Sequence, residues 1–170
     1  QISTIRHDVY ADELHQYDAN ADGVLEDPGR HFIACVEDDD LVGYISLNPP
    51  ESQPFRLTTY FSRDVLERTA FAACNDPAKT TFEVRGLTVA PAYRGQNLAF
   101  RLIRHALEFV VERGGTDIVA MGHTNVVKLY ENNGMKVFRD DGVKHGETVY
   151  FPMHLSVSTV LRAFAEKIQA

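Results

Sequence analysis

The segment from Phe82 to Val111 restricts the possible folds more than any other part of the chain. Residues 82–89 are mostly apolar and β-branched, and Pro91 follows them, so a strand is expected that ends near Ala90. From Leu98 onward the apolar residues recur at the spacing of one helix face. A helix N-terminus offers unpaired N–H groups and a partial positive charge. The connection at residues 94–99 is therefore predicted to hold an anion such as a phosphate.

The remaining elements are predicted to surround this strand, turn and helix. Alternating or continuous apolar patterns predict strands at 31–36 and 41–48, joined by an acidic turn, and further strands at 116–121, 135–139 and 148–155. Helices are expected weakly within 2–17, after a Ser62 cap, after a Thr124 cap and after Ser158. Strand alternation is expected to place Glu83, Arg85, Leu87 and Val89 on one face.

Composition narrows the class of protein. With 170 residues, of which 44% are hydrophobic, the chain is expected to form a single domain, residues 1–170, with a sizeable core. A net charge of −7 argues against a nucleic-acid partner, and no long apolar run suggests a membrane partner. Cys35 and Cys74 lie in apolar contexts, which is typical of a reducing, cytoplasmic location. Because the chain begins at Gln1, it could belong to a larger multidomain protein, and a homodimer is equally open.

A calcium site is one alternative that the sequence raises. Asp18, Asn20, Asp22 and Gly23 match the first half of an EF-hand loop. The twelfth position is Gly29 instead of glutamate, and Pro28 blocks the helix that should follow. A polar surface turn without a metal is the preferred interpretation.

Two short segments resemble a known family. Residues 94–99, Arg-Gly-Gln-Asn-Leu-Ala, are similar to the phosphate loop of the GCN5-related N-acetyltransferases (GNAT), with Asn97 at the position of the middle glycine. Asparagine adopts positive φ at low cost, so the loop is expected to keep its form. Leu129 to Met135 resembles the family's LYEKxGF segment, with Tyr130 on the tyrosine.

The resemblance implies a mixed α/β fold and a donor site. The expected fold is a central, twisted, mostly antiparallel sheet of about six or seven strands, splayed at the 82–89 strand, with helices on both faces. The implied co-substrate is acetyl-CoA or acyl-CoA, without a metal. By the same resemblance, the donor-binding residues are Leu87, Thr88, Val89, Arg94, Gly95, Gln96, Asn97, Leu98, Ala99, His123 and Asn125.

Two residues are candidates for proton transfer. Glu83 lies eleven positions before Arg94, where the histone-acetylating branch of the family carries its general base. Its alternative role is a structural carboxylate paired with Arg85. Tyr130 can protonate the leaving thiolate, since the reference pKa values of tyrosine and a thiol are about 10 and 8.5. The alternative for Tyr130 is a core tyrosine.

A finer resemblance concerns the donor and the acceptor. Asn97, the long insert at 49–81 and the tail at 144–153 are similar to the bacterial N-acyl amino acid synthases, relatives of the acyl-homoserine lactone synthases that use acyl carrier protein. The insert is a predicted lid over the acyl or acceptor pocket. The predicted function is transfer of an acetyl or longer acyl group to the amine of a small molecule or amino acid. The alternatives are an enzyme similar to the N-acyl amino acid synthases with acyl carrier protein as the donor, and a non-catalytic acyl-thioester-binding domain of a larger protein. Candidate substrate-binding residues are Phe55, Arg56, Tyr60 and Arg85, with the arginines suited to an acceptor carboxylate and the aromatic residues to the acyl end of the donor.

Overall fold

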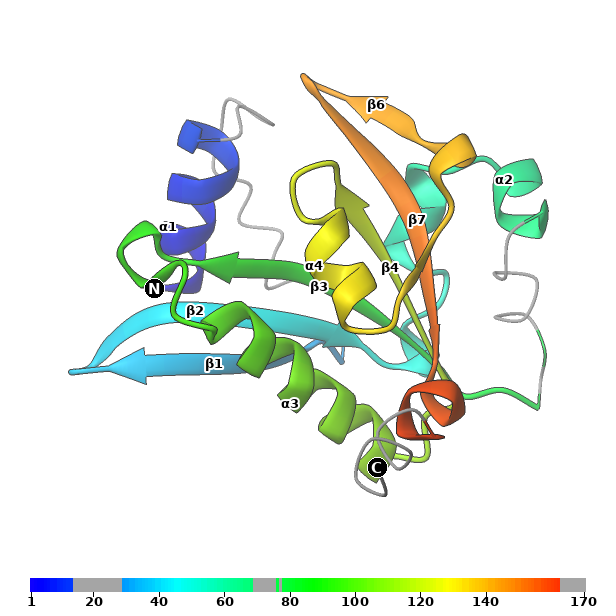
Figure 1. Cartoon of the computed structure of the whole chain (residues 1–170), viewed down its shortest axis with the longest axis horizontal. Helices are drawn as coiled ribbons and strands as arrows, with labels where there is room; N and C mark the ends of the chain where they lie inside the picture. The colour runs from blue at the N-terminus through cyan, green and yellow to red at the C-terminus, as the bar shows by residue number, and fades with distance from the viewer. Residues whose placement is uncertain (14–28, 69–75, 77, 163–170) are drawn as a thin grey trace.

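The computed structural model describes residues 1–13, 29–68, 76 and 78–162. Its centre is a seven-stranded sheet in the order β1-β2-β3-β4-β7-β5, with β6 paired to the outer part of β7 (Figure 1). Only β3 and β4 are parallel, and the other neighbours are antiparallel. The strands are β1 (His31–Glu37), β2 (Asp40–Asn48), β3 (Thr81–Val89), β4 (Asp117–His123), β5 (Lys136–Val137), β6 (Val143–His145) and β7 (Thr148–Ser156).

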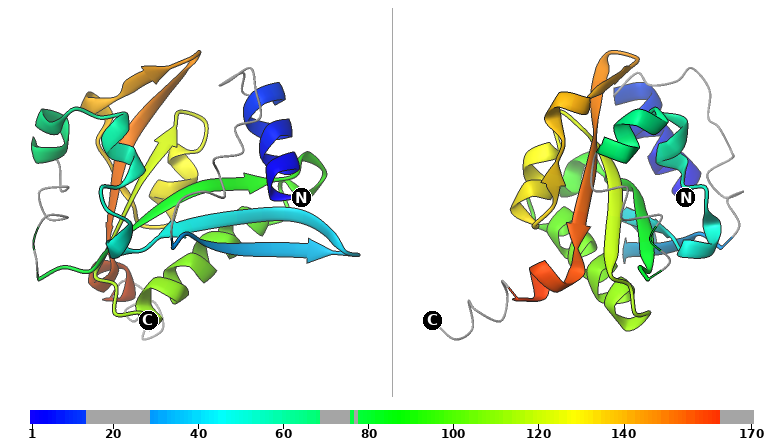
Figure 2. Two further views of the ribbon diagram at one scale, coloured as in Figure 1. Left: turned by 180° about the vertical axis from the view of Figure 1, so that it is seen from behind. Right: turned by 90° about the vertical axis from the view of Figure 1, so that its right-hand side faces the viewer.

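Helices cover both faces of the sheet (Figure 2). The long α3 (Leu98–Glu112) and the short α4 (Val127–Asn132) lie on one face. On the other face lie α1 (Ile2–His7), its π-helical continuation η1 (Asp8–Glu13), and the insert that joins β2 to β3. The insert contains η3 (Pro50–Ser52), η4 (Arg56–Thr59) and α2 (Arg63–Arg68), while η6 (Pro91–Tyr93) and η7 (Arg139–Asp141) are single 3₁₀ turns elsewhere. The predicted mixed α/β fold with a mostly antiparallel sheet is confirmed.

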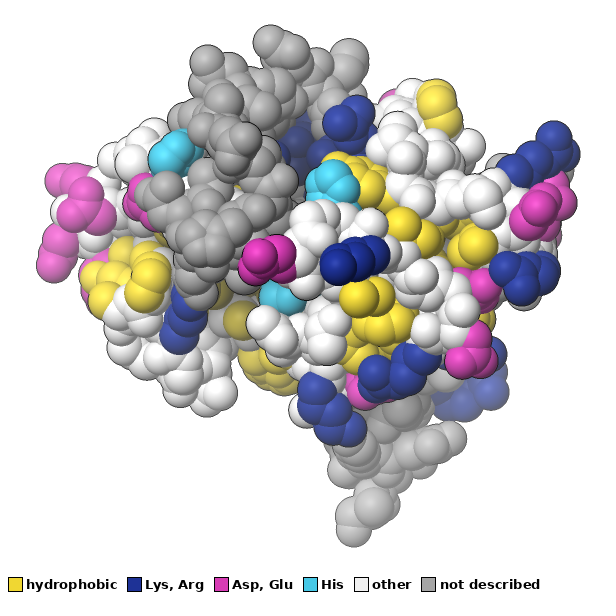
Figure 3. All heavy atoms as spheres, turned by 90° about the horizontal axis from the view of Figure 1, so that it is seen from above, with side chains coloured by type: hydrophobic (Ala, Val, Ile, Leu, Met, Phe, Trp, Pro, Cys, Tyr) yellow, Lys and Arg dark blue, Asp and Glu magenta, His cyan; other side chains and the backbone are white. Residues whose placement is uncertain are grey.

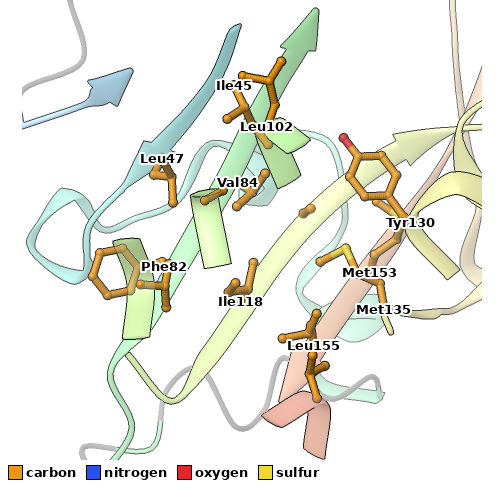
Figure 4. Close-up of a cluster of buried hydrophobic side chains, with 14 of the residues drawn as sticks. Ile45, Leu47, Phe82, Val84, Leu102, Ile118, Tyr130, Met135, Met153 and Leu155 are labelled. Atoms are coloured by element: carbon orange, nitrogen blue, oxygen red, sulfur yellow. The ribbon is translucent and has the colours of Figure 1, made fainter. Parts of the chain in front are cut away.

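Two apolar clusters stabilise this arrangement on opposite faces of the sheet. The main core packs α3 against β2, β3, β4 and β7, and Figure 4 shows its members converging from these elements. On α3 the buried positions Leu98, Leu102, Ala106 and Val110 repeat every four residues, as the sequence pattern predicted. A second cluster seats the insert on β4 and β7, and it consists of Phe55, Leu57, Phe61, Val119 and Tyr150.

The sheet opens between β3 and β4. These strands pair from Thr81 opposite Asp117 to Val84 opposite Ala120, and no pairing continues beyond that point. The rest of β3, to Val89, and of β4, to His123, diverges, so the predicted splay is confirmed.

A β-bulge in β3 corrects the predicted alternation of its side chains. Tyr44 of β2 pairs with Thr88, but Ser46 pairs with Arg85, so Gly86 and Leu87 both oppose one residue. Gly86 has φ +59°, a conformation that glycine adopts without strain. Leu87 and Val89 consequently pack on the α3 side together with Val84. The expectation that Glu83, Arg85, Leu87 and Val89 share one face is wrong.

Most of the other local predictions are confirmed, except the predicted cap of α4 and the predictions for residues that the structure does not describe. Thr124 does not cap α4, because its hydroxyl donates to the Val149 carbonyl (3.2 Å) and the N-cap is Val126. Ser62 does cap α2, accepting the Val65 N–H at 3.4 Å. The acidic segment Asp18 to Pro28 and Cys74 lie outside the described residues. Within the described ranges, no helix is long and apolar enough to cross a membrane.

Candidate acyl-thioester site

The predicted phosphate loop lies between β3 and α3. Gly95 and Asn97 both have positive φ, +79° and +60°, and Asn97 is the N-cap of α3. Asn97 thus holds the left-handed conformation expected of the glycine it replaces. The Asn97 carbonyl accepts the Arg101 N–H at 3.0 Å, so the first helical turn is regular. The loop borders a cavity of about 220 Å³, which Val89 and Leu129 also line.

Side chains of the loop are partly held by its own backbone. Arg94 Nε donates to the Val89 carbonyl at 3.1 Å, and Gln96 Nε2 donates to the Ala92 carbonyl at 3.2 Å. The acidic tip of the β1–β2 hairpin borders the loop, because Glu37 beside Tyr93 raises the pKa of that phenol. Figure 3 shows acidic side chains gathered over this end of the molecule. An anion at the loop therefore relies on the N–H groups of the α3 N-terminus and on Arg94.

The predicted arm-binding residues line the diverging part of β3 and β4. Leu87 and Val89 are half-buried on the α3 side, and Thr88 is buried on the opposite side, beside Tyr44. His123, at the end of β4, is half-buried, with its ring 6.0 Å from that of Tyr150. Asn125 is exposed in the turn after β4. Leu98 is buried in the core, and Ala99 is half-buried.

Tyr130 projects from α4 into the opening between β3 and β4. Its side chain is 6% exposed, and in Figure 4 its hydroxyl points away from Met135 and Leu155, toward β3. Burial raises the pKa of Tyr130, so the phenol keeps its proton at all ordinary pH values. Within the described part of the chain, no hydrogen-bond partner of this hydroxyl is found. The group is thus a protonated donor aimed at the splay.

Glu83 lies on the other face of the sheet from Tyr130, at the paired end of β3. It is 1% exposed, and its carboxylate accepts hydrogen bonds from Leu57 N–H (2.7 Å), Arg56 N–H (3.0 Å) and Asn48 Nδ2 (3.1 Å). Burial raises the pKa of Glu83, although the Leu57 N–H, the Arg85 charge and the Arg56 N–H act in the opposite direction. The two residues predicted to transfer protons are therefore held in different environments on opposite sides of the β3–β4 seam.

Three of the four predicted substrate-binding residues lie on the insert, and the fourth lies on β3. Phe55 is 5% exposed and belongs to the second apolar cluster, whereas Arg56 is exposed on η4. Tyr60 contacts His145 edge to face, with ring centroids 5.4 Å apart. Arg85 is half-buried on the same face of β3 as Glu83. The insert and β3 are in contact through the hydrogen bonds between η4 and Glu83, so the structure places these residues in neighbouring elements.

Sequence reasoning did not identify two tyrosines at the opening. The Tyr10 hydroxyl, from η1, lies 3.4 Å from the Leu87 carbonyl at the bulge. Burial raises the pKa of Tyr10, and Tyr44, Tyr130 and Tyr150 are near enough to raise it further. Tyr44 itself is fully buried on β2 beside Thr88. No motif marks these residues, since only the packing of the N-terminal helix brings Tyr10 to β3.

An apolar cavity of about 480 Å³ adjoins Tyr130 on the α3 face. Its walls come from α3, α4 and the strands at the base of the splay, and three exposed apolar residues, Phe100, Val111 and Leu161, stand at its rim. Val84 belongs to the last pair of β3 and β4 and Ile118 to an earlier one, so the cavity lies over the paired part of these strands and reaches the point where they begin to diverge. Further apolar lining residues are Ile45, Ile103, Ala106, Leu107, Met135 and Leu155, and the polar residues Arg104, Glu108 and Asn133 also line it.

Comparison with known proteins identifies relatives of this arrangement. The model of the acetyltransferase (GNAT) family matches residues 3–135. No curated protein matches the chain. The solved structures that share the fold at low identity include the following three. FeeM, an N-acyl amino acid synthase from uncultured soil microbes, is 15% identical with a TM-score of 0.72, over 92% of this chain and 83% of its own.

The other two are an aminoglycoside 6′-N-acetyltransferase complexed with coenzyme A and the CoA-dependent acyl-homoserine lactone synthase BjaI. The first is 17% identical with a TM-score of 0.60, over 91% of this chain and 90% of its own. The second is 15% identical with a TM-score of 0.64, over 97% of this chain and 79% of its own.

Proposed function

Because the chain belongs to the acetyltransferase (GNAT) family, we propose that it moves an acyl group longer than acetyl from coenzyme A to the primary amine of a small molecule or amino acid. The amine nitrogen attacks the thioester carbonyl carbon, the C–S bond breaks, and an amide and free thiol result. The transfer is direct, within a ternary complex. A base takes the proton that the amine loses, and the Tyr130 hydroxyl supplies one to the sulfur.

The opening between β3 and β4 supports this assignment of roles. The donor's phosphates would lie on the loop at the α3 N-terminus, and its pantetheine arm would run along Leu87 and Val89 toward Tyr130. The Val89 N–H would then lie near the thioester oxygen, where negative charge develops. The base predicted from the sequence is Glu83, and the contacts of its carboxylate bear on that role.

The apolar cavity beside Tyr130 is the observation that supports a longer acyl group. It is about 480 Å³, lies at the end of the opening, and has walls made chiefly of aliphatic side chains. An acetyl group would leave most of that apolar surface uncovered, whereas a longer chain would bury it. Two fold relatives, an N-acyl amino acid synthase and an acyl-homoserine lactone synthase, are consistent with such a donor.

A series of saturated acyl-CoA esters, from acetyl to dodecanoyl, tests the proposal. Dissociation constants from calorimetry and CoA release with a panel of amines and amino acids would be measured side by side. Each methylene buried in the cavity should tighten binding about fourfold, since it contributes about 0.8 kcal/mol. Affinity that is flat from acetyl to dodecanoyl would contradict the longer donor.

The variant Ala106→Phe provides the matched control. Ala106 is 2% exposed and lines the cavity, so a phenyl ring there should fill the space that the distal carbons need. Acetyl-CoA binding should be unchanged, while the gain with chain length should disappear. Acyl chains on carrier protein belong in the same assay, because response to them alone would assign the donor to that class.

The insert is proposed as a lid on the acceptor side. It lies over β4 and β7, on the opposite face from the acyl cavity, and carries Arg56 and Tyr60. Shortening the insert should change acceptor selectivity without changing the preference for acyl length.

A further inference from the structure

We infer that Glu83 is a positioning residue, whose carboxylate fastens the insert to β3 and thereby sets the acceptor-side wall of the site. The assignment of this wall to the acceptor rests on the proposed function. The attachment of the insert to β3 by the carboxylate does not, because it is a property of the fold. It assigns Glu83 a role other than the general base.

The geometry of the carboxylate carries the inference. Oε1 accepts the Leu57 N–H at 2.7 Å, and Oε2 accepts both the Arg56 N–H at 3.0 Å and Asn48 Nδ2 at 3.1 Å. Arg56 and Leu57 are the first two residues of η4, so these N–H groups have no partner within their own helix. One buried side chain thus joins β2, β3 and the insert.

A charged acceptor is suited to this position. The first N–H groups of a helix carry partial positive charge, and hydrogen bonds to a carboxylate are stronger than neutral ones. A carboxylate that is 1% exposed needs such donors to offset its burial. Replacing Glu83 would leave two backbone N–H groups of η4 without an acceptor.

The fastened turn carries the wall of the site. Leu57 is 1% and Phe61 is 2% exposed, and both pack against Val119 and Tyr150. The Tyr150 ring lies 6.0 Å from His123 and 6.4 Å from His145, and His145 contacts Tyr60 of the insert. A continuous line of packed rings therefore connects the insert to the end of β4, beside the opening.

The same geometry is unfavourable for direct proton abstraction. A base has to reach the amine directly or through one water. Both oxygens of Glu83 already accept hydrogen bonds, and the side chain is only 1% exposed, so a substrate amine or a bulk water has little access to it.

Amide hydrogen exchange provides the test, with Glu83→Gln as the first variant. It keeps the shape of the side chain but places an amide group against the N–H donors. Exchange at the Arg56 and Leu57 amides should accelerate by at least about tenfold, while the amides of α3 stay as in the wild type. Unchanged exchange at both positions would overturn the inference.

Arg56→Pro separates the fastening from the carboxylate itself, because it removes one donor and leaves Glu83 intact. Proline is favoured at the first helical position, and Phe55 before it has φ −62° and ψ 150°, which proline requires. The matched control is Arg56→Gln, which loses the guanidinium but keeps the N–H. Leu57 exchange should rise in the proline variant and not in the glutamine variant.

Kinetics with an amine found by the acyl-CoA panel distinguish a fastener from a base. If Glu83 is a positioning residue, both Glu83→Gln and Arg56→Pro should raise the acceptor KM several-fold. The fall in rate toward acidic pH should persist in both variants. A loss of kcat by about a hundredfold or more in Glu83→Gln alone, together with loss of that fall in rate, would identify a base and overturn the inference. If no amine is acylated, the proposed function fails, while the exchange measurements still decide the role of Glu83.

Discussion

At the scale of single residues, Tyr130 and Glu83 are two buried protonatable groups with different surroundings. Tyr130 points a protonated hydroxyl into the opening between β3 and β4. The Glu83 carboxylate accepts hydrogen bonds from a side-chain amide and two backbone N–H groups. The first can give a proton to a developing thiolate, and the second organises backbone.

Tyr130→Phe should separate binding from turnover. Removing the hydroxyl leaves the ring packed in the core, so the melting temperature and the affinity for acyl-CoA should stay close to the wild type. The rate of acyl transfer should fall by about 10²–10⁴-fold, which is the usual contribution of a positioned acid. Stopped-flow measurement of thiol release, with calorimetry of donor binding, checks both parts. An unchanged rate of acyl transfer in Tyr130→Phe would mean that the Tyr130 hydroxyl has no part in the reaction and that the residue is purely structural.

At the scale of elements, the bulge in β3 decides which of its side chains face α3 and which lie on the opposite face of the sheet. One extra residue at Gly86 and Leu87 turns Leu87 toward α3 and Thr88 toward Tyr44. The strand thereby presents apolar side chains to α3 and polar side chains, among them Glu83 and Thr88, to the opposite face of the sheet. The loop after β3 adds the second special conformation, at Gly95 and Asn97.

Gly86→Ala should destabilise the fold by about 1–2 kcal/mol, which is the cost of a side chain in a left-handed conformation. A Cβ at this position meets nothing closer than 3.5 Å, so the cost is conformational and not steric. Gly95→Ala is the matched control. Gly95 also has a positive φ, +79°, and no atom lies within 4 Å of the added carbon, but it lies in the loop before α3 and not in the bulge. Urea unfolding of both variants gives the comparison. Equal stability of Gly86→Ala and wild type would mean that the bulge relaxes.

At the scale of the whole molecule, a buried ionic cluster ties the paired end of the sheet. Asp117 at the start of β4 is 2% exposed, and its Oδ1 lies 2.7 Å from His154 Nε2 on β7 and 3.1 Å from Lys79 Nζ. Burial disfavours the charge, but hydrogen bonds from His154, Thr116 and Lys79 prevail, and the pKa of Asp117 is lowered. This cluster closes the sheet at the end opposite the opening.

Asp117→Asn should therefore reduce stability in a pH-dependent way. Because the folded pKa lies below the unfolded value, the stabilisation is fully present above the ordinary aspartate value and is lost as pH falls through the folded pKa. At neutral pH the variant should be less stable by about 2 kcal/mol, the usual contribution of hydrogen bonds to a charged group. Urea unfolding from pH 7 to pH 3 should show the difference shrinking toward acid. A difference in the free energy of unfolding that stays constant from pH 7 to pH 3 would mean that the charge of Asp117 is not the source of the stabilisation.

Local patterns in the sequence were sufficient for much of the fold. The α3 helix, the β1–β2 hairpin, the β3 strand and the turn at Asn97 each depend on a few consecutive residues, whose spacing and φ preferences act locally. The same holds for the placement of Tyr130 on a short helix after β4. These features, and the family resemblance of residues 94–99 and 129–135, were predictable from the chain alone.

The tertiary structure decided the surroundings of the candidate residues. Glu83 finds its donors at Asn48, Arg56 and Leu57, between 26 and 35 positions away, and Tyr10 reaches Leu87 across 77 positions. The bulge follows from pairing β3 with β2, and the acyl cavity from how α3 and α4 pack over the splay. Backbone preferences act over a few residues, whereas burial, hydrogen-bond partners and cavities arise only when distant segments pack together.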